Sequence, residues 1–206
     1  FDDYFVQEGL AFRFTPFNYK KWGDAEGDNG YAIDTEKFYE NVMNRYKYGG
    51  LDTPGLYLDE TTMRICYSHR RLFAQLAKEL VKQGDNARAQ KVLAYAEQAI
   101  PAYNVPQVYE SGSYDIATAY ASIGETGKAI TLLNDLISES RDYIDWAFSL
   151  GDSRIAMVQR DCLYKFWQWN QCNGLLKDMD KERYKQSNQQ FEEKYMRLAQ
   201  LMNYQN

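Results

Sequence analysis

The amino-acid sequence predicts an all-α fold of antiparallel helical hairpins, stacked as a short right-handed array behind an N-terminal extended or short-strand arm. Apolar residues recur at helical spacing over most of the chain after residue 34. Glycines separate the helical segments, and one pattern of small and large residues occurs twice. With 206 residues, the chain is long enough to bury a substantial core.

The first hairpin is predicted over residues 60–101. Gly84 ends its first helix and Asp85 caps the second. Small residues let the two helix backbones approach closely while larger ones fill the grooves between them; these residues are Phe73, Leu76, Ala77, Leu80, Ala89, Leu93 and Ala96, with Pro101 after the second helix. Their order follows the tetratricopeptide (TPR) repeat, so the predicted hairpins are TPR-like.

The same pattern recurs in the second predicted hairpin, residues 109–140. Six positions match between the copies, namely Leu76, Ala77, Leu80, Gly84, Ala89 and Leu93 with Ile116, Ala117, Tyr120, Gly124, Ala129 and Leu133. The copies are 40 residues apart (84 to 124), longer than the usual repeat of about 34. A connector bracketed by Pro101 and Pro106 accounts for the excess.

Capping helices are predicted over residues 142–206. They comprise a short apolar segment (143–150), a helix over about 153–172 broken by Asn173-Gly174, and a last helix over about 180–204. Stacked repeats must cover their terminal apolar face. The predicted array therefore spans residues 60–206.

Residues 1–59 are predicted to form an arm, a loop and a first helix that pack on the array. Period-two alternation over residues 4–17 predicts a short strand or an extended arm that docks on the helices or pairs. A helix is predicted after Asp34, ending at Gly49-Gly50. The loop between them carries Asp24, Glu26 and Asp28, spaced like the start of a calcium loop. Asn29 and Thr35 replace the glycine and bidentate glutamate of such a loop, so a solvated turn is predicted.

Composition excludes some partners. A net charge of -5 argues against nucleic acid, and no run of about 20 apolar residues predicts direct membrane insertion by this chain. No segment of these residues has the pattern expected of a signal peptide. Because the chain starts at Phe1 rather than Met, we expect a fragment or processed product. Cys66, Cys162 and Cys172 lack metal-ligand spacing, and the first two are expected to be small buried residues.

No catalytic motif is found, so we expect this chain not to be an enzyme and to need no cofactor or metal. His69 is the sole histidine, which excludes histidine-cluster metal sites, and neither a P-loop nor a dinucleotide fingerprint occurs. Two adjacent acid pairs, Asp59/Glu60 and Glu192/Glu193, could in principle act on glycosides. Adjacent acids on a helix usually point apart, and Asp59 is better explained as a helix cap.

Two sets of residues are candidates for ligand contact. A groove between first helices could bind a protein or peptide segment through Tyr67, Arg70, Arg71, Tyr114 and Tyr120. The alternative interpretation is a solvated helix face, with Tyr120 in the core. Glycan binding would use exposed rings of Trp22, Trp167 or Trp169, and burial of all three would exclude it.

Three segments resemble a known family: Glu8–Phe17, Ile33–Gly50 and Leu56–Asp85. They resemble the C-terminal soluble, TPR-like tail of bacterial multi-pass membrane proteins similar to protein O-mannosyltransferases, a domain of unknown function. The resemblance covers about residues 4–150. It implies a tail on the periplasmic side of the bacterial inner membrane, tethered through upstream transmembrane segments and contacting that membrane module or a protein or peptide.

The resemblance carries over no catalytic residue, because the presumed catalytic acids of that family lie in the membrane part. The parent protein could then be a glycosyltransferase even though this chain is not. The glycan-binding alternative is similar to the TPR part of SusD-like nutrient-binding lipoproteins, which use aromatic residues on sugar rings.

Overall fold

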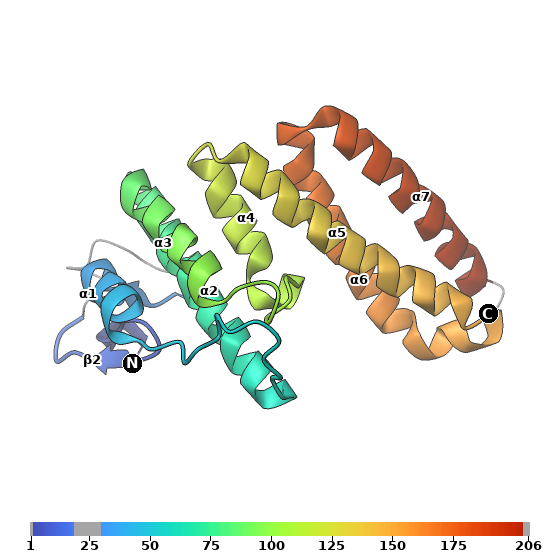
Figure 1. Ribbon diagram of the computed structural model, residues 1–206. Coiled ribbons are helices and arrows are strands. Elements are labelled where there is room, and N and C mark those ends of the chain that lie inside the picture. Colours follow the sequence, from blue (N-terminus) through green and yellow to red (C-terminus); the bar gives the residue numbers. More distant parts are fainter. Residues whose placement is uncertain (1, 19–29, 204–206) are drawn as a thin grey trace. The chain divides into compact units, whose positions relative to one another are not determined.

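The computed structural model describes residues 2–18 and 30–203 (Figure 1). Most of the described residues are helical, which confirms the predicted all-α class. The chain forms two compact units: unit 1 contains Phe1–Pro106 and Glu110–Glu125, and unit 2 contains Gln107–Tyr109 and Thr126–Asn206. The chain passes from unit 1 into unit 2 after Glu125, between α4 (Ser113–Ser122) and α5 (Thr126–Ser149).

Unit 1 begins with a short 3₁₀ turn, η1 (Asp2–Tyr4), and a three-stranded sheet in the order β2-β1-β3. The strands are β1 (Phe5–Gln7), β2 (Phe12–Phe14) and β3 (Ala32–Ile33). The segment predicted as a short strand or an extended arm contains two strands, because Gly9, with φ of 121°, allows a turn that pairs β1 antiparallel with β2. β3 pairs with β1 in parallel.

A helix follows the sheet but ends earlier than predicted. Asp34 caps α1 (Thr35–Glu40) by accepting a hydrogen bond from the Lys37 N–H. The chain then forms a π-helical turn, η3 (Asn41–Arg45), and becomes extended at Tyr46. The predicted end at Gly49-Gly50 was therefore wrong. The Tyr48 hydroxyl donates to the Val42 carbonyl at 3.0 Å, which satisfies an acceptor that the helix end leaves without an intrahelical partner.

The first predicted hairpin is formed by α2 (Glu60–Lys82) and α3 (Asn86–Ala99), which pack on one another. Asp59 and Asp85 cap them, accepting from the Thr62 and Arg88 N–H groups. Gly84 has φ of 78° and donates its N–H to Val81, while Asp85 donates to Leu80. This pair of bonds is a Schellman motif, for which glycine is favoured because it adopts positive φ without strain.

The helix α4 (Ser113–Ser122) ends in the same way as α2. Gly124 has φ of 84° and donates to Ala121, while Glu125 donates to Tyr120. The residues at the six matched positions are buried in both copies apart from the glycines: Leu76, Ala77, Leu80, Ala89, Leu93, Ile116, Ala117, Tyr120, Ala129 and Leu133. The repeated sequence pattern therefore corresponds to repeated helix ends and repeated burial.

Polar side chains join the N-terminal segment to this hairpin. The amides of Gln7 on β1 and Gln75 on α2 donate to one another at 2.9 and 2.8 Å. One guanidinium nitrogen of Arg88 on α3 donates to both carboxylate oxygens of Glu36 on α1, at 2.7 and 2.9 Å. These contacts explain why residues 1–59 belong to unit 1 together with α2 and α3.

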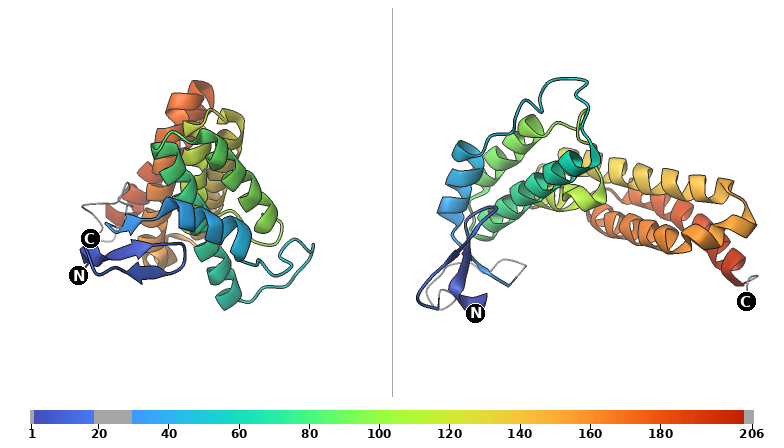
Figure 2. Two further views of the ribbon diagram at one scale, coloured as in Figure 1. Left: turned by 90° about the vertical axis from the view of Figure 1, so that its left-hand side faces the viewer. Right: turned by 90° about the horizontal axis from the view of Figure 1, so that it is seen from below.

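Unit 2 contains three long helices, α5 (Thr126–Ser149), α6 (Asp152–Met179) and α7 (Lys181–Asn203). α6 packs against both α5 and α7 (Figures 1 and 2). Two predicted boundaries were wrong. Residues 143–149 continue α5, and α6 passes through Asn173-Gly174, because Asn173 is buried against α7 and accepts a hydrogen bond from Ser187 at 2.6 Å.

Candidate functional site

The residues predicted to form a groove do not form one open surface. Arg70 and Tyr120 are buried, whereas Tyr67 and Tyr114 are half-buried and Arg71 is exposed. The Tyr120 hydroxyl donates to Glu97 at 2.6 Å, and Arg71 donates to the Glu110 carbonyl at 2.8 Å. Tyr120 thus has the core position that was the alternative interpretation, and the predicted groove role of Arg70 requires correction.

Arg70 is 1% exposed and holds the connector between α3 and α4. Its guanidinium donates to the carbonyls of Ile100, Val105 and Pro106 at 3.2, 2.6 and 2.8 Å, and to the Ser111 hydroxyl at 3.0 Å. Burial lowers the pKa of Arg70 to about 10, so it keeps its charge at neutral pH. A buried cation that is fully engaged inside unit 1 has a structural role and no free face for a ligand.

The three tryptophans predicted for glycan stacking have different outcomes. Trp22 lies outside the described residues. Trp169 is buried and its indole N–H donates to Ser187 at 2.8 Å. Trp167 is 46% exposed and stacks on Tyr164, with ring centroids 5.6 Å apart and planes inclined by 13°. Of the three predicted tryptophans, Trp167 is therefore the one that the structure describes with an exposed ring able to stack on a sugar. The acids spaced like a calcium loop, within residues 20–29, also lie outside the described residues.

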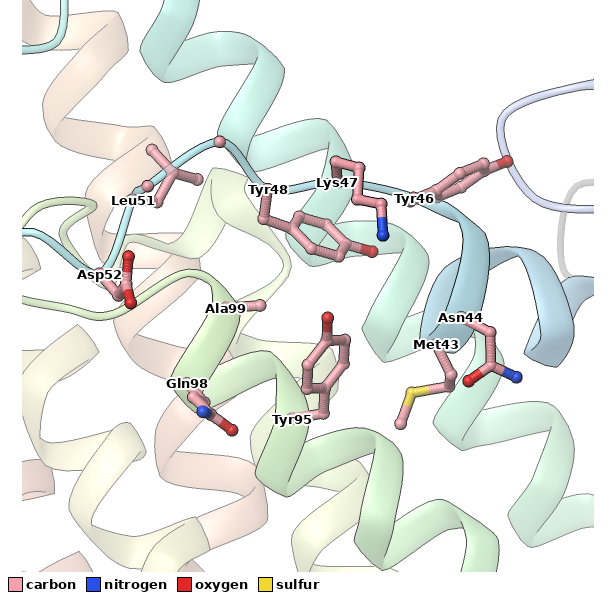
Figure 3. Close-up of a pocket in the computed structure, with 12 residues that line it drawn as sticks. Met43, Asn44, Tyr46, Lys47, Tyr48, Leu51, Asp52, Tyr95, Gln98 and Ala99 are labelled. Carbon is pink, nitrogen blue, oxygen red and sulfur yellow. The ribbon is translucent and has the colours of Figure 1, made fainter.

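A pocket of about 290 Å³ lies where the chain leaves η3 and passes the end of α3. We call it the tyrosine pocket. Figure 3 shows Tyr48 from the loop and Tyr95 from α3 pointing toward one another, with the side chains of Lys47, Asn44 and Gln98 around them. The remaining lining residues are Met43, Tyr46, Gly49, Gly50, Leu51, Asp52 and Ala99.

An aromatic cluster fixes the floor of the tyrosine pocket. The Tyr48 ring lies 5.5 Å from His69, 5.4 Å from Phe73 and 5.9 Å from Tyr95, measured between ring centroids. Burial, together with the neighbouring Tyr95 and Tyr46, raises the pKa of Tyr48, so its phenol stays protonated. Burial lowers the pKa of His69, so this side chain is neutral at neutral pH. The cluster therefore surrounds Tyr48 with aromatic rings and is uncharged at neutral pH.

The rim of the tyrosine pocket carries polar groups available to a ligand. Within the described part of the chain, no side-chain hydrogen bond or ion pair engages the Lys47 ammonium, the Asp52 carboxylate, the Gln98 amide or the Tyr95 hydroxyl. Together they offer donors and acceptors of both charges beside two aromatic faces. Such a mixture favours binding of a polar ligand that also has an apolar part.

Lys47, Tyr48 and Tyr95 are absent from the residues predicted to contact a ligand. Tyr46 and Tyr48 are two residues apart and precede Gly49-Gly50, a spacing that departs from the helical period. From this spacing, an extended chain at Tyr46–Tyr48 could have been predicted. Tyr95 on α3 is 47 residues from Tyr48 (48 to 95), so no local pattern joins the two.

The three cysteines are shielded from solvent, whereas the two acid pairs have exposed or capping positions. All three cysteines are buried, and burial raises the pKa of the Cys172 thiol to about 12, which makes it a poor nucleophile. Asp59 caps α2 while Glu60 pairs with Arg64 at 2.6 Å. Glu192 and Glu193 are exposed. The acid pairs thus have exposed or capping positions.

No protein-family model, curated protein or solved structure matches this chain. Among residues 2–18 and 30–203, no group of three or more histidine, cysteine, aspartate or glutamate side chains is placed to hold a metal ion. Within the same residues, no helix has the length and apolar character needed to cross a bilayer.

Proposed function

We propose that this chain is a non-catalytic, TPR-like interaction domain that binds an extended protein or peptide segment in the tyrosine pocket. The observation that carries the proposal is the set of unengaged groups on the rim above an aromatic floor, namely Lys47, Asp52, Tyr95 and Gln98. An amide side chain such as Gln98 matches a peptide bond, since each has one carbonyl acceptor and N–H donors. The faces of Tyr48 and Tyr95 suit an apolar side chain of the same peptide.

The resemblance to the tails of mannosyltransferase-like membrane proteins supports a location for this function. In this proposal the domain lies on the periplasmic side of a bacterial inner membrane, and its array of hairpins binds a protein or positions an upstream membrane module. Protease accessibility in spheroplasts tests the location, since a periplasmic domain is digested without lysis of the inner membrane. Protection until lysis would place it in the cytoplasm.

Selection of peptides from a displayed library of random heptapeptides tests the binding site. Affinity of the selected peptides is then measured by calorimetry for the parent chain and for variants Lys47→Ala, Gln98→Ala and Tyr95→Phe. Each rim variant should weaken binding by about 3- to 10-fold, since each removes one or two hydrogen bonds worth about 1 kcal/mol. The control is Lys91→Ala, an exposed lysine on α3 outside the pocket. Peptides that bind the rim variants as tightly as the parent chain would refute the proposed site.

Glycan binding is a second candidate, and the exposure of Trp167 favours it. The near-parallel Tyr164 ring extends the aromatic surface, and sugar rings stack on such surfaces. Titration with defined oligosaccharides, for example mannotriose and maltoheptaose, should quench tryptophan fluorescence in the parent chain and not in Trp167→Ala. A quench that persists in Trp167→Ala would exclude this platform.

A further inference from the structure

The helices α5 and α7 of unit 2 are joined by a regular series of long side chains. Gln190 accepts from Arg141 at 3.5 Å, Lys194 pairs with Asp145, and the Arg197 guanidinium lies 4.5 Å from the centre of the Phe148 ring. Each pair is separated by 49 residues (190 minus 141, 194 minus 145, 197 minus 148). The constant separation means that α5 and α7 run parallel in one register, both against α6.

The series is open toward the N-terminal part of α7. There the two helices line a slot of about 510 Å³, which we call the α5–α7 slot. Its walls follow the same register, with Asn134 opposite Arg183 and Ser138 opposite Ser187. Eight of the nine lining residues are polar or charged: Asn134, Asp135, Ser138, Arg141, Arg183, Gln186, Ser187 and Gln190, with Ile137 as the ninth.

Hydrogen-bond donors dominate these walls. Arg141 donates to Ser138 at 3.0 Å, and its neighbour Asp142 is 3.8 Å away. Arg183 pairs with Asp180 at 3.2 Å. A guanidinium has five N–H donors, so both arginines retain donors after these contacts. The amides of Asn134, Gln186 and Gln190 add further donors on both walls.

A buried donor lies behind the slot. Ser187, which lines the slot, accepts from the Trp169 indole and donates to the Asn173 carbonyl oxygen at 2.6 Å. Asn173 is 1% exposed, and its amide nitrogen has no hydrogen-bond partner within the described residues. A buried donor without an acceptor destabilises the protein by about 1–3 kcal/mol. The hydroxyl of Ser187 thus connects the slot to a polar group that lacks an acceptor.

Asp135 is the one carboxylate among the lining residues. No side-chain cation within the described residues pairs with it, although Arg183 and Arg141 line the same slot. An anion in the slot would be attracted by the two guanidiniums and repelled by Asp135. This opposition gives the site an electrostatic signature that an ordinary basic surface lacks.

From the two arginines that line it and the surplus of donors on its walls, we propose that the α5–α7 slot binds an oxyanion-bearing ligand. The shared chemistry is a carboxylate or phosphate group, whose oxygens match the planar donor pairs of arginine. This site lies in unit 2 and is independent of the tyrosine pocket of unit 1. A negative result in the test of one site therefore leaves the proposal for the other site unaffected.

The test is a titration of the whole ¹⁵N-labelled chain with sodium citrate and, separately, with sodium phosphate. Ionic strength is held constant with sodium chloride, because screening alone alters charged surfaces. Saturable shifts of amide signals from residues 134–141 and 183–190 are expected. Citrate binding without phosphate binding identifies a carboxylate ligand, and the reverse identifies a phosphate ligand. Shifts that are absent, or that sodium chloride alone reproduces, would overturn the proposal.

Four variants separate this site from adventitious anion binding. Arg141→Gln and Arg183→Gln should each weaken binding about tenfold or more, as expected for a charged hydrogen bond. Asp135→Asn should strengthen it several-fold by removing the repulsion. Arg154→Gln, an exposed arginine of α6 outside the slot, should leave it unchanged. Equal effects of Arg154→Gln and Arg183→Gln, or weaker binding in Asp135→Asn, would contradict the assignment.

Discussion

Replacement of Arg70 by methionine should destabilise unit 1 strongly. Methionine replaces the aliphatic stem of arginine but is shorter and donates no hydrogen bond, so the carbonyls of Ile100 and Val105 lose the donor that they have inside the protein. Ser111 keeps a hydroxyl contact with Ser113 at 2.8 Å, and Pro106 is exposed, so these two acceptors are partly compensated. The net effect therefore comes mainly from two buried carbonyls.

Each buried acceptor left without a donor costs about 1–3 kcal/mol. Removal of the buried charge returns part of the desolvation energy that lowers the pKa of Arg70. We therefore expect the free energy of unfolding to fall by about 2–4 kcal/mol, a large part of the roughly 5–15 kcal/mol typical of a folded domain. The connector formed by residues 100–111 should lose protection first, since Arg70 is its anchor.

Urea denaturation followed by circular dichroism measures the loss, and hydrogen exchange read by mass spectrometry locates it. The adjacent Arg71→Met is the matched control, because Arg71 is exposed and reaches one connector carbonyl; it should cost less than about 1 kcal/mol. Arg70→Lys should remain destabilised, since a single ammonium cannot reproduce the planar fork. A wild-type stability for Arg70→Met, or full rescue by lysine, would refute this account.

Three further predictions follow from single interactions. Gly84→Ala and Gly124→Ala should each lower the free energy of unfolding by about 1 kcal/mol, measured by thermal or urea unfolding, because both positions have positive φ. Gly174→Ala should raise it by up to about 1 kcal/mol, because Gly174 lies inside α6 with open space for a Cβ. Equal effects of the three substitutions would contradict the capping argument. The free energy of unfolding should fall as pH drops below about 6.5, because burial lowers the pKa of His69 and the unfolded chain binds this proton first. Urea titrations at pH 7.5 and 5.5 measure this pH dependence, which should be smaller in His69→Leu. An unchanged pH dependence in that variant would exclude His69 as its source. Gln75→Leu should destabilise by about 1–3 kcal/mol and speed hydrogen exchange in β1, since it removes both hydrogen bonds between the Gln75 and Gln7 amides. Exchange equal to that of the parent chain would show that the amide pair does not hold β1.

The sequence by itself determined the helical class and the ends of several helices. Gly84 and Asp85 mark the end of α2 and the start of α3 because glycine adopts positive φ and aspartate accepts from the first turn of a helix. The equivalent Gly124 marks the end of α4. These features act within a few residues, so a local pattern contains the information. The predicted helix end at Asn173-Gly174 was wrong, because packing of the buried Asn173 against α7 outweighs the weak local preference of these two residues for ending a helix.

Only the tertiary structure decided the fate of the candidate site residues. Arg70 and Arg71 are neighbours in a basic, aromatic stretch, yet one is buried and the other exposed. The acceptors that contact the buried Arg70 lie 30 to 41 residues away in the chain. Tyr95 lines the tyrosine pocket from α3, whereas Tyr48 lines it from the loop after η3. Helix periodicity states which residues share a face, whereas the partner that covers the face is set by contacts distant in sequence. The α2–α3 hairpin could therefore be predicted from the sequence, whereas the tyrosine pocket could not.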